Sequence, residues 1–367
     1  MTPLPPAAEE DTFFRLLRIA SGCGGELPRK LTEEEWLRMA DLAKRQALGG
    51  ILMQAVEQLP PADRPPQRIL FQWIGWTGKI ENVNRRLNCA ATAVSLYFKE
   101  KGFRPTILKG QGAAETYPNP LRRTPGDIDI WIEGDRKRIF RLARTIDPKA
   151  KAVYHHIDMK GLSEEFEVEL HTTPSWMNNP FTNRKLQRMF RRWAQENAAK
   201  EITLTGAGSV RVPSDEMNRV FLLVHIYRHL MAEGIGLRQL MDYFFLLRKG
   251  TDEEARKRFA GQLRELKMMR FAGAVMYVLG RVFGLEERLM PVPPSKKYGG
   301  RLLEEIMRAG NFGLYDERID RSGKDTEWRR FRRRMKRIVR FAADYPDEVC
   351  WTPWFKIWHF FWRKAHN

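Results

Sequence analysis

Two aspartates separated by one isoleucine are the side chains of this sequence best suited to carry chemistry. Residues 127–130 read Asp-Ile-Asp-Ile, and this alternation predicts a β-strand with both carboxylates on one face and both isoleucines buried behind them. Carboxylates that close together repel each other unless a cation lies between them. Their hard oxygen atoms suit Mg²⁺ or Mn²⁺, ions that serve phosphoryl transfer by neutralising a triphosphate and aligning the reacting oxygens. The alternative for Asp127 and Asp129 is an exposed strand edge without a ligand.

A glycine turn lies upstream of the aspartates, at the end of a strand that we predict over residues 104–108. Residues 108–112 read Leu-Lys-Gly-Gln-Gly. A glycine at position 110 lets backbone amides approach phosphate oxygens, and Lys109 can add a positive charge. Pairing of Lys109 with a carboxylate is an equally good interpretation.

A third acidic position follows on another predicted strand. Residues 166–171 read Phe-Glu-Val-Glu-Leu-His, which supplies a third metal ligand and a candidate general base. Glu167 and Glu169 share a face of the strand, so the alternation alone does not choose between them. His171 follows on the same face, where it either orients a carboxylate or serves a structural role.

Together these segments resemble the DNA polymerase beta-like nucleotidyltransferase superfamily and, more narrowly, a bacterial family described as uncharacterised nucleotidyltransferase. The resemblance extends over roughly residues 31–250. The residues that carry it are Leu108-Lys109-Gly110, Tyr117-Pro118-Asn119-Pro120, Arg122 or Arg123, Gly126-Asp127-Ile128-Asp129-Ile130, Val168-Glu169-Leu170-His171, His225, and Gly236-Leu237-Arg238 with Asp242.

The resemblance implies a donor, a metal and a set of site residues. It implies that Asp127, Asp129 and Glu169 are catalytic and hold Mg²⁺ (or Mn²⁺), and it alone selects Glu169 over Glu167. It also implies a nucleoside triphosphate donor, around which we place Lys109, Gly110, Gln111 and Arg123. The predicted reaction transfers a nucleoside monophosphate to an acceptor hydroxyl of RNA (especially tRNA), a protein or a small molecule.

Gln111 departs from the pattern of the superfamily, in which many members carry Gly-Ser or Gly-Gly where this chain has Gly-Gln. A bulkier side chain can reshape the turn. The departure keeps open a second interpretation, a non-catalytic pseudoenzyme that binds a nucleotide or RNA. A third interpretation is a peripheral membrane protein of a surface-polysaccharide system.

The elements that must position these residues form a small sheet between helical regions. A capping box at residues 32–35 begins one helix, and a long helix is predicted from about residue 67 to residue 101. Short alternating segments and a glycine-rich hairpin follow, and helical periodicity dominates from Ser214 onward. We therefore predict an α+β fold, a small mixed nucleotidyltransferase-like sheet flanked by helices, in three parts: an N-terminal helical region (1–101), an α+β core (102–213) and a C-terminal helical region (214–367) with a basic, Trp-rich end.

Excess positive charge is concentrated in two stripes near the core and the C-terminus. Of the formal net charge of +19, residues 184–200 contribute +5 and residues 321–340 contribute +8. Such stripes suit a polyanion, so RNA is the predicted macromolecular partner, with a solvated helix face as the alternative. For the aromatic stripe at the C-terminal end we predict core packing, with RNA stacking or a membrane surface as alternatives. Its members are Trp351, Trp354, Trp358, Phe361 and Trp362.

The composition indicates a soluble globular protein, with 43% hydrophobic and 30% charged residues among 367. No stretch approaches the roughly 20 apolar residues of a transmembrane helix, and no signal peptide is visible. The cysteines Cys23, Cys89 and Cys350 are far apart and form no CxxC pair. They argue against a disulfide framework and fit a reducing compartment, so we predict a cytoplasmic protein.

Overall fold

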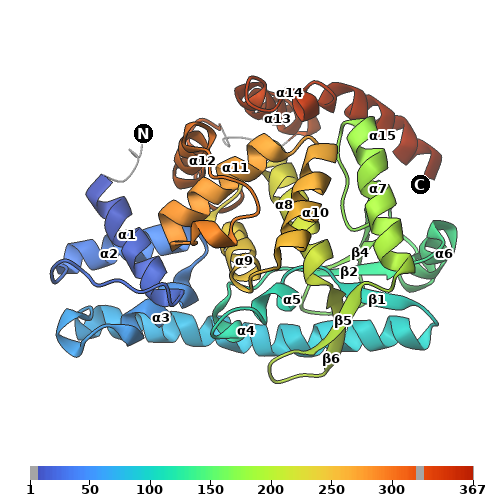
Figure 1. Ribbon diagram of the computed structural model, residues 1–367. Coiled ribbons are helices and arrows are strands. Elements are labelled where there is room, and N and C mark those ends of the chain that lie inside the picture. Colours follow the sequence, from blue (N-terminus) through green and yellow to red (C-terminus); the bar gives the residue numbers. More distant parts are fainter. Residues whose placement is uncertain (1–6, 320–325, 367) are drawn as a thin grey trace.

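The computed structural model describes residues 7–319 and 326–366 (Figure 1). Helices predominate, and a four-stranded sheet and a two-stranded sheet are formed by residues from the middle of the sequence. This confirms the predicted α+β fold class, with helices at both ends of the chain.

The N-terminal region is helical, as predicted. The capping box is present at Thr32 and Glu35, and the long fourth helix continues unbroken through Gly75 and Gly78 before the chain turns at Gly102, whose φ is +76°. The helices are α1 (Ala7–Ala20), α2 (Glu33–Arg45), α3 (Gly49–Gln58) and α4 (Gln67–Glu100), with a short 3₁₀ segment η1 (Pro61–Asp63) before α4.

All strands in the described part of the chain lie in the central region. Its elements are β1 (Arg104–Ile107), α5 (Gln111–Ala114), η2 (Pro120–Arg122), β2 (Ile128–Glu133), α6 (Arg136–Ile146), β3 (His156–Met159), β4 (Val168–His171), α7 (Pro180–Gln195), β5 (Ala199–Thr203) and β6 (Ser209–Pro213). The predicted glycine-rich hairpin is confirmed as the antiparallel pair β5–β6.

The C-terminal region returns to helices. They are α8 (Asp215–Ala232), α9 (Leu237–Arg248), α10 (Glu253–Glu265), α11 (Met269–Val278), α12 (Lys296–Ala309), α13 (Glu327–Phe341), α14 (Pro346–Val349) and α15 (Thr352–His366). Short segments η3 (Leu279–Phe283), η4 (Glu287–Leu289) and η5 (Asn311–Gly313) connect some of them.

The four-stranded sheet is mixed and has the order β1-β2-β4-β3. β2 runs antiparallel to β1 and parallel to β4, and β4 runs antiparallel to β3. The register of the parallel pair places Ile128 beside Val168 and Asp129 beside Glu169. Two acidic residues that are far apart in the sequence therefore become nearest neighbours across the centre of the sheet.

Helix α4 covers one face of this sheet and fixes which side chains point inward (Figure 1). Ile128 and Ile130 of β2 are buried in a hydrophobic cluster with Leu87 and Val94 of α4. The predicted alternation is thus confirmed: the isoleucines pack against the long helix, and the acidic side chain between them belongs to the opposite face. Asp127 lies one residue before β2, not within it.

The two helical regions share a second hydrophobic cluster. It joins Leu17 of α1 and Ile51 of α3 to Phe244 of α9 and Val275 of α11, all of which are buried. The ends of the chain are therefore held together by one apolar core, while the sheet has its own core against α4.

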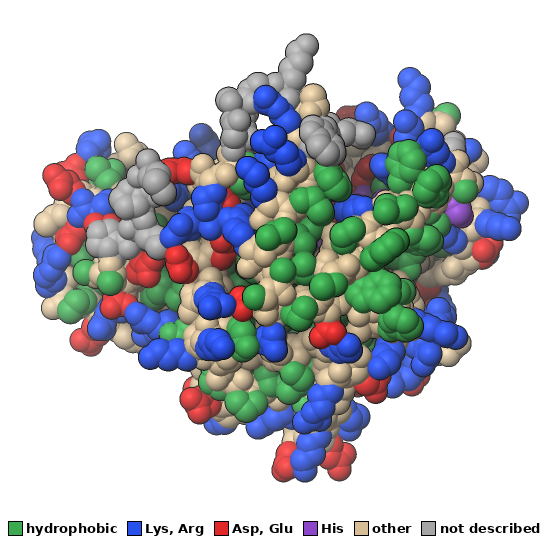
Figure 2. Space-filling model, turned by 90° about the horizontal axis from the view of Figure 1, so that it is seen from above, with side chains coloured by type: hydrophobic (Ala, Val, Ile, Leu, Met, Phe, Trp, Pro, Cys, Tyr) green, Lys and Arg blue, Asp and Glu red, His purple; other side chains and the backbone are tan. Residues whose placement is uncertain are grey.

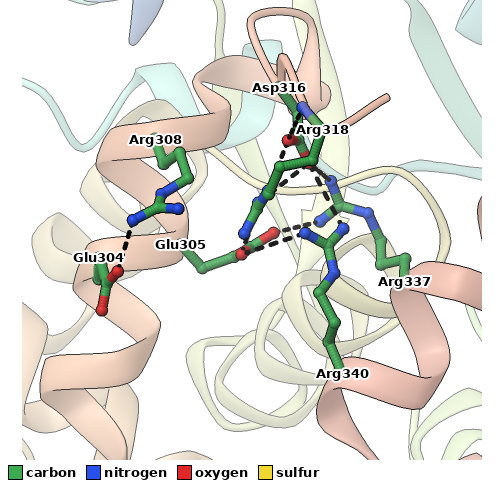
Figure 3. Close-up of polar contacts among 7 residues, drawn as sticks. All are labelled: Glu304, Glu305, Arg308, Asp316, Arg318, Arg337 and Arg340. Atoms are coloured by element: carbon green, nitrogen blue, oxygen red, sulfur yellow. Dashed lines mark hydrogen bonds and ion pairs between the residues drawn. The ribbon is translucent and has the colours of Figure 1, made fainter. Parts of the chain in front are cut away.

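A buried network of ions fixes α13 to the end of α12 (Figure 3). Arg337 donates to Glu305 at 3.0 Å and to Asp316 at 3.1 Å, and its side chain is 1% exposed. Arg318 bridges the same two carboxylates at 2.7 Å each. Part of the basic stripe 321–340 therefore neutralises internal carboxylates and is not available to a polyanion; residues 321–325 lie outside the described residues.

The expectation of core packing for the C-terminal aromatic stripe is wrong for much of α15. Trp354, Trp358 and Phe361 are 67%, 45% and 63% exposed, whereas Trp351 and Trp362 are half-buried. The helical spacing was correctly interpreted as a helix, but both of its faces are apolar and the body of the protein covers only one. In the described parts of the chain, no helix is both long enough and apolar enough to span a bilayer.

We predict that the Arg337 network is a main stabilising feature of the C-terminal region. Arg337→Met leaves Glu305 and Asp316 short of a buried partner and should lower the free energy of unfolding by about 3 kcal/mol. Arg308→Met is the matched control, because Arg308 pairs with Glu304 one helical turn away, on the surface of α12 (Figure 3). That substitution should cost no more than about 0.5 kcal/mol. Equal shifts in urea denaturation would contradict this ranking.

Candidate active site

Four side chains meet where β2 and β4 run side by side. The Oδ1 atom of Asp129 lies 3.0 Å from Nζ of Lys109 and 2.9 Å from Nε2 of His171. The same Nε2 atom is 3.3 Å from Oε2 of Glu169. The local structure places each residue at this point. Lys109 follows β1, Asp129 lies on the face of β2 opposite to the buried isoleucines, and Glu169 and His171 share one face of β4.

Burial and opposite charge act together on the ionisable groups of this cluster. Burial disfavours the charged form of Lys109, but the carboxylates of Asp129, Asp127 and Glu169 outweigh it, so the pKa of Lys109 is raised. Burial likewise opposes ionisation of Glu169, yet hydrogen bonding to His171 and the nearby His156 and Lys109 lower its pKa to about 2. Both groups are therefore charged at neutral pH.

The same neighbours favour the protonated form of His171. Burial lowers its affinity for a proton, but hydrogen bonds to Asp129 and Glu169 more than compensate, and the pKa of His171 is raised. The predicted role of a residue that orients a carboxylate agrees with these contacts. The predicted pairing of Lys109 with a carboxylate is also observed, with Asp129 as the partner.

One oxygen of the cluster has no hydrogen-bond partner among the described residues. Asp129 is 2% exposed, and its Oδ2 atom is buried without a hydrogen-bond partner, as is Nδ1 of His171. An unpaired carboxylate oxygen in a protein interior is costly, so such an atom marks a place where a ligand belongs. Ligand atoms of Asp129, Glu169 and His171 all lie within 4.8 Å of one another, which suits a divalent cation.

A second group of candidate ligands adjoins the first and shares Glu169 with it. His156 and Asp158 of β3 complete this group, again with ligand atoms within 4.8 Å of one another. Nε2 of His156 lies 2.9 Å from Asp158. The edge strand β3 therefore extends the cluster with nitrogen and oxygen donors that the sequence interpretation had not included.

Asp127 lies beside the glycine turn at the entrance to β2. Gly110 has a φ of +58°, a conformation that suits glycine, and a side chain there would come within 3.5 Å of the carbonyl oxygen of Asp127. The charge of Asp127 contributes to the raised pKa of Lys109. The structure thus brings Lys109, Gly110, Asp127, Asp129 and Glu169 together, although the groups with metal-ligand spacing include Asp129 and not Asp127.

The side chain of Gln111 points away from this cluster and into α4. It is 3% exposed and donates to the side-chain oxygens of Asn88 and Asn84. A contact between this residue and a phosphate would have to come from its backbone amide. The bulky residue in the turn therefore does not fill the space next to Asp129, and its role in nucleotide binding stays a prediction.

Arg123 is committed to a buried ion pair behind the site. Its guanidinium donates to both carboxylate oxygens of Asp242 on α9, at 2.8 Å each, and the hydroxyl of Tyr117 donates to the same carboxylate at 2.6 Å. Arg238 donates to the carbonyl oxygens of Thr124 and Pro125. These contacts hold the segment that enters β2, so Arg123 contributes by positioning Asp127 and Asp129, and direct contact with a nucleotide stays a prediction.

Histidines surround the cluster to an extent that the sequence interpretation missed. Burial and then nearby cations lower the pKa of His155 and His225 well below the usual value, so both are neutral. The ring of His155 lies 3.6 Å from that of Trp176, and the guanidinium of Arg228 lies over the same tryptophan ring. The chain contains seven histidines, but their spacing in the sequence is irregular, so their gathering around the cluster becomes visible only in the fold.

The mixed sheet, its acidic pair and the flanking glycine turn define a protein of the nucleotidyltransferase kind. A model of the family described as uncharacterised nucleotidyltransferase matches residues 32–284, which is more than half of the chain, and the protein belongs to this family. The resemblance inferred from the sequence is thereby confirmed.

Other comparisons add little. A search of curated proteins gave no match. Among solved structures, an antigenic nucleotidyltransferase-like protein from Paracoccidioides brasiliensis aligns with 60% of this chain and 97% of its own, at 11% identity and a TM-score of 0.30. A likeness of that size is too low to support an argument about the site.

We predict that Mn²⁺ binds at Asp129 with an affinity that rises with pH. A histidine ligand must lose its proton, and because the pKa of His171 is raised, binding should weaken as the pH falls through that pKa and strengthen above it. Glu169, with a pKa of about 2, stays ionised throughout and contributes no such dependence. Calorimetry with Mn²⁺ between about pH 6 and pH 9 measures the effect.

Asp129→Asn should lower this Mn²⁺ affinity by more than about tenfold, and His171→Asn should flatten its pH dependence. Asp158→Asn is the informative comparison, since Asp158 belongs only to the second group. Loss of binding in Asp158→Asn but not in Asp129→Asn would move the ion to β3.

Proposed function

We propose that this protein is a metal-dependent nucleotidyltransferase that transfers a nucleoside monophosphate from a nucleoside triphosphate to an acceptor hydroxyl. The observation that carries the proposal is the cluster of Asp129, Glu169 and His171, in which one buried oxygen of Asp129 has no hydrogen-bond partner among the residues that the structure describes. Family membership supports the class of reaction. The proposed metal ligands are those inferred from the sequence, Asp127, Asp129 and Glu169, with His171 added.

In the proposed reaction the acceptor oxygen attacks the α-phosphorus and the hydroxyl proton passes to water, while the bond from that phosphorus to the bridging oxygen breaks and pyrophosphate leaves with the electron pair. A bound divalent ion would neutralise charge on the triphosphate and lower the barrier to this displacement. Lys109 orients Asp129 through its 3.0 Å contact and places a positive charge beside the turn at Gly110. Backbone amides of that turn would then approach the phosphate oxygens.

Glu169 fits the role of a ligand better than that of a general base. A group with a pKa of about 2 accepts a proton weakly near neutral pH. The same low pKa keeps the carboxylate ionised and ready to hold a cation. We therefore assign Glu169 to the metal and not to proton abstraction from the acceptor hydroxyl.

The surrounding histidines favour Mn²⁺ over Mg²⁺ as the activating ion. Mg²⁺ prefers an octahedral shell of oxygen atoms, whereas Mn²⁺ accepts imidazole nitrogen more readily. In this cluster Nε2 of His171 contacts both acidic residues. Both ions remain in the proposal, with the stronger activation expected from Mn²⁺.

RNA is the acceptor class best supported by the surface charge. Helix α7 exposes the side chains of Arg184, Lys185, Arg188, Arg191 and Arg192 along its length. In the other stripe, Arg337 is buried in the network with Glu305 and Asp316, so we expect α7 to contribute more. A protein or small-molecule acceptor, and a binding-only pseudoenzyme, are the alternatives.

We predict that Glu169→Gln abolishes label transfer while Glu167→Gln does not. The two residues are two positions apart, but Glu167 is exposed and precedes β4, whereas Glu169 lies beside Asp129. Loss of a metal ligand should reduce turnover on the order of a hundredfold or more. The assay incubates each α-labelled nucleoside triphosphate with Mn²⁺ or Mg²⁺ and with total RNA, protein or small-molecule fractions.

The outcome separates the candidate functions. Transfer by the wild type and by Glu167→Gln, but not by Glu169→Gln, supports catalysis at this cluster. Nucleotide and metal binding with no transfer to any fraction would favour the pseudoenzyme. Equal loss in both variants would show that the carboxylate beside Asp129 has no special role.

A further inference from the structure

The C-terminal helix α15 has two apolar faces, and only one of them packs against the protein. On the inner face, Phe355, His359 and Trp362 lie at positions i, i+4 and i+7 and share a side of the helix. Phe355 stacks on Trp176 with ring centroids 6.2 Å apart, and Trp362 lies 6.3 Å from Tyr154. Nε2 of His359 accepts a hydrogen bond from the backbone amide of Tyr154 at 3.2 Å.

The outer face of α15 is a continuous apolar strip that the protein leaves uncovered. Trp354, Ile357, Trp358 and Phe361 occupy positions i, i+3, i+4 and i+7, which is one face of a helix, and Trp358 stands at its inner edge, where its ring also contacts Tyr154. They are 67%, 55%, 45% and 63% exposed. Figure 2, which views the molecule from the side that is uppermost in Figure 1, shows hydrophobic side chains gathered in a band with Lys and Arg around it.

Positive charge flanks this strip, and acidic residues are absent from the same part of the sequence. Residues 351–367 contain Lys356, Arg363 and Lys364 and no Asp or Glu. Lys356 is half-buried, and burial together with the cations Arg334 and Arg228 lowers its pKa to about 8. The helix therefore combines a hydrophobic strip with two exposed cations, Arg363 and Lys364, near its end.

The helix is held rigidly to the body of the protein at its beginning. Glu348 is buried and accepts hydrogen bonds from the backbone amides of Asn178 and Asn179, and the side chain of Asn178 donates to Thr352 at 3.0 Å. The strip is thus presented on a preformed helix, so a partner need not meet the entropic cost of ordering it.

We propose that α15 docks this protein onto the surface of an anionic lipid bilayer. The helix lies in the plane of the interface, with Trp354, Ile357 and Phe361 at the boundary of the acyl chains. Arg363 and Lys364 lie at the level of the lipid phosphates. Tryptophan and phenylalanine on one face and lysine and arginine beside it are the composition that interfacial helices use.

Two other occupants fit the strip less well. A second copy of the chain would bring the same cations of each protomer against one another, in a protein that already carries a net charge of +19. RNA would supply phosphates and bases for stacking, but the aliphatic Ile357 in the centre of the strip would gain no comparable contact. A bilayer provides hydrocarbon for the whole strip and phosphate for its flanks.

The test measures binding of the full chain to vesicles of phosphatidylglycerol and phosphatidylcholine by co-sedimentation. Wild type should bind these vesicles and bind vesicles of phosphatidylcholine alone much more weakly. The triple variant Trp354→Ser, Ile357→Ser and Phe361→Ser should bind at least about tenfold more weakly. Trp358 is left intact because its ring contacts Tyr154 at 5.2 Å.

A matched control removes the same kind of surface from another helix. Phe71, Ile74 and Leu96 on α4 are 67%, 47% and 49% exposed, and α4 lies on the side of the molecule away from α15 (Figure 1). The triple variant Phe71→Ser, Ile74→Ser and Leu96→Ser should bind vesicles as the wild type does. Unchanged thermal midpoints of both triple variants establish that each is folded.

A charge variant tests the electrostatic part of the proposal. Arg363→Gln with Lys364→Gln should weaken binding and reduce its dependence on salt. Failure of the wild type to bind anionic vesicles at low salt would overturn the proposal, as would full binding by the α15 triple variant. A wild-type dimer that the α15 triple variant dissociates, or tRNA binding that it abolishes, without vesicle binding by the wild type, would assign the strip to those partners.

Discussion

The parallel pairing of β2 with β4 is the interaction on which the candidate site depends. Its register sets Asp129 beside Glu169, and the intervening Ile128, Ile130, Val168 and Leu170 are buried on the other face against the α4 side. A slip by one residue would exchange the two faces and send a carboxylate into the hydrophobic cluster. The apolar core under the sheet therefore holds the acidic residues in place more firmly than any contact within the site.

Repulsion between the carboxylates of Asp129 and Glu169 and their partial removal from water oppose folding. Neighbouring side chains offset this cost. Lys109 and His171 contribute positive charge at Asp129, while Arg123 and Asp242 hold the chain that enters β2 by an ion pair of their own. Even so, Oδ2 of Asp129 accepts no hydrogen bond from the residues that the structure describes. One oxygen of Asp129 is neutralised by Lys109 and His171, whereas the other is buried without a hydrogen bond, and this arrangement suits the binding of a cation. A buried unpaired carboxylate oxygen destabilises the fold, which is expected only where function requires it.

The sequence predicts the parts of this arrangement that are local. The alternation of acidic and apolar residues over 127–130 and 166–171 predicts both strands and the face on which each acidic side chain lies. Gly110 by itself predicts the turn. To select Glu169 over Glu167 as the neighbour of Asp129, one needs the register of two strands that lie 40 residues apart in the chain. The alternation within each strand does not reveal that register. The side chains of Gln111 and Arg123 bind Asn88 of α4 and Asp242 of α9. Because these partners come from other parts of the chain, the sequence could not reveal them, and both residues were placed beside the nucleotide instead.

The same limit explains the C-terminal helix and connects it with the site. Helical periodicity reveals one apolar face when the other is polar, but α15 is apolar on both, and the sequence cannot say which side the body of the protein covers. The inner side, with Phe355 and Trp362, contacts Tyr154 and Trp176, and Trp176 adjoins His155. The exposed strip is therefore the outer surface of a layer whose inner surface contacts Tyr154 and Trp176, and through Trp176 and His155 this layer is connected to His171 of the acidic cluster.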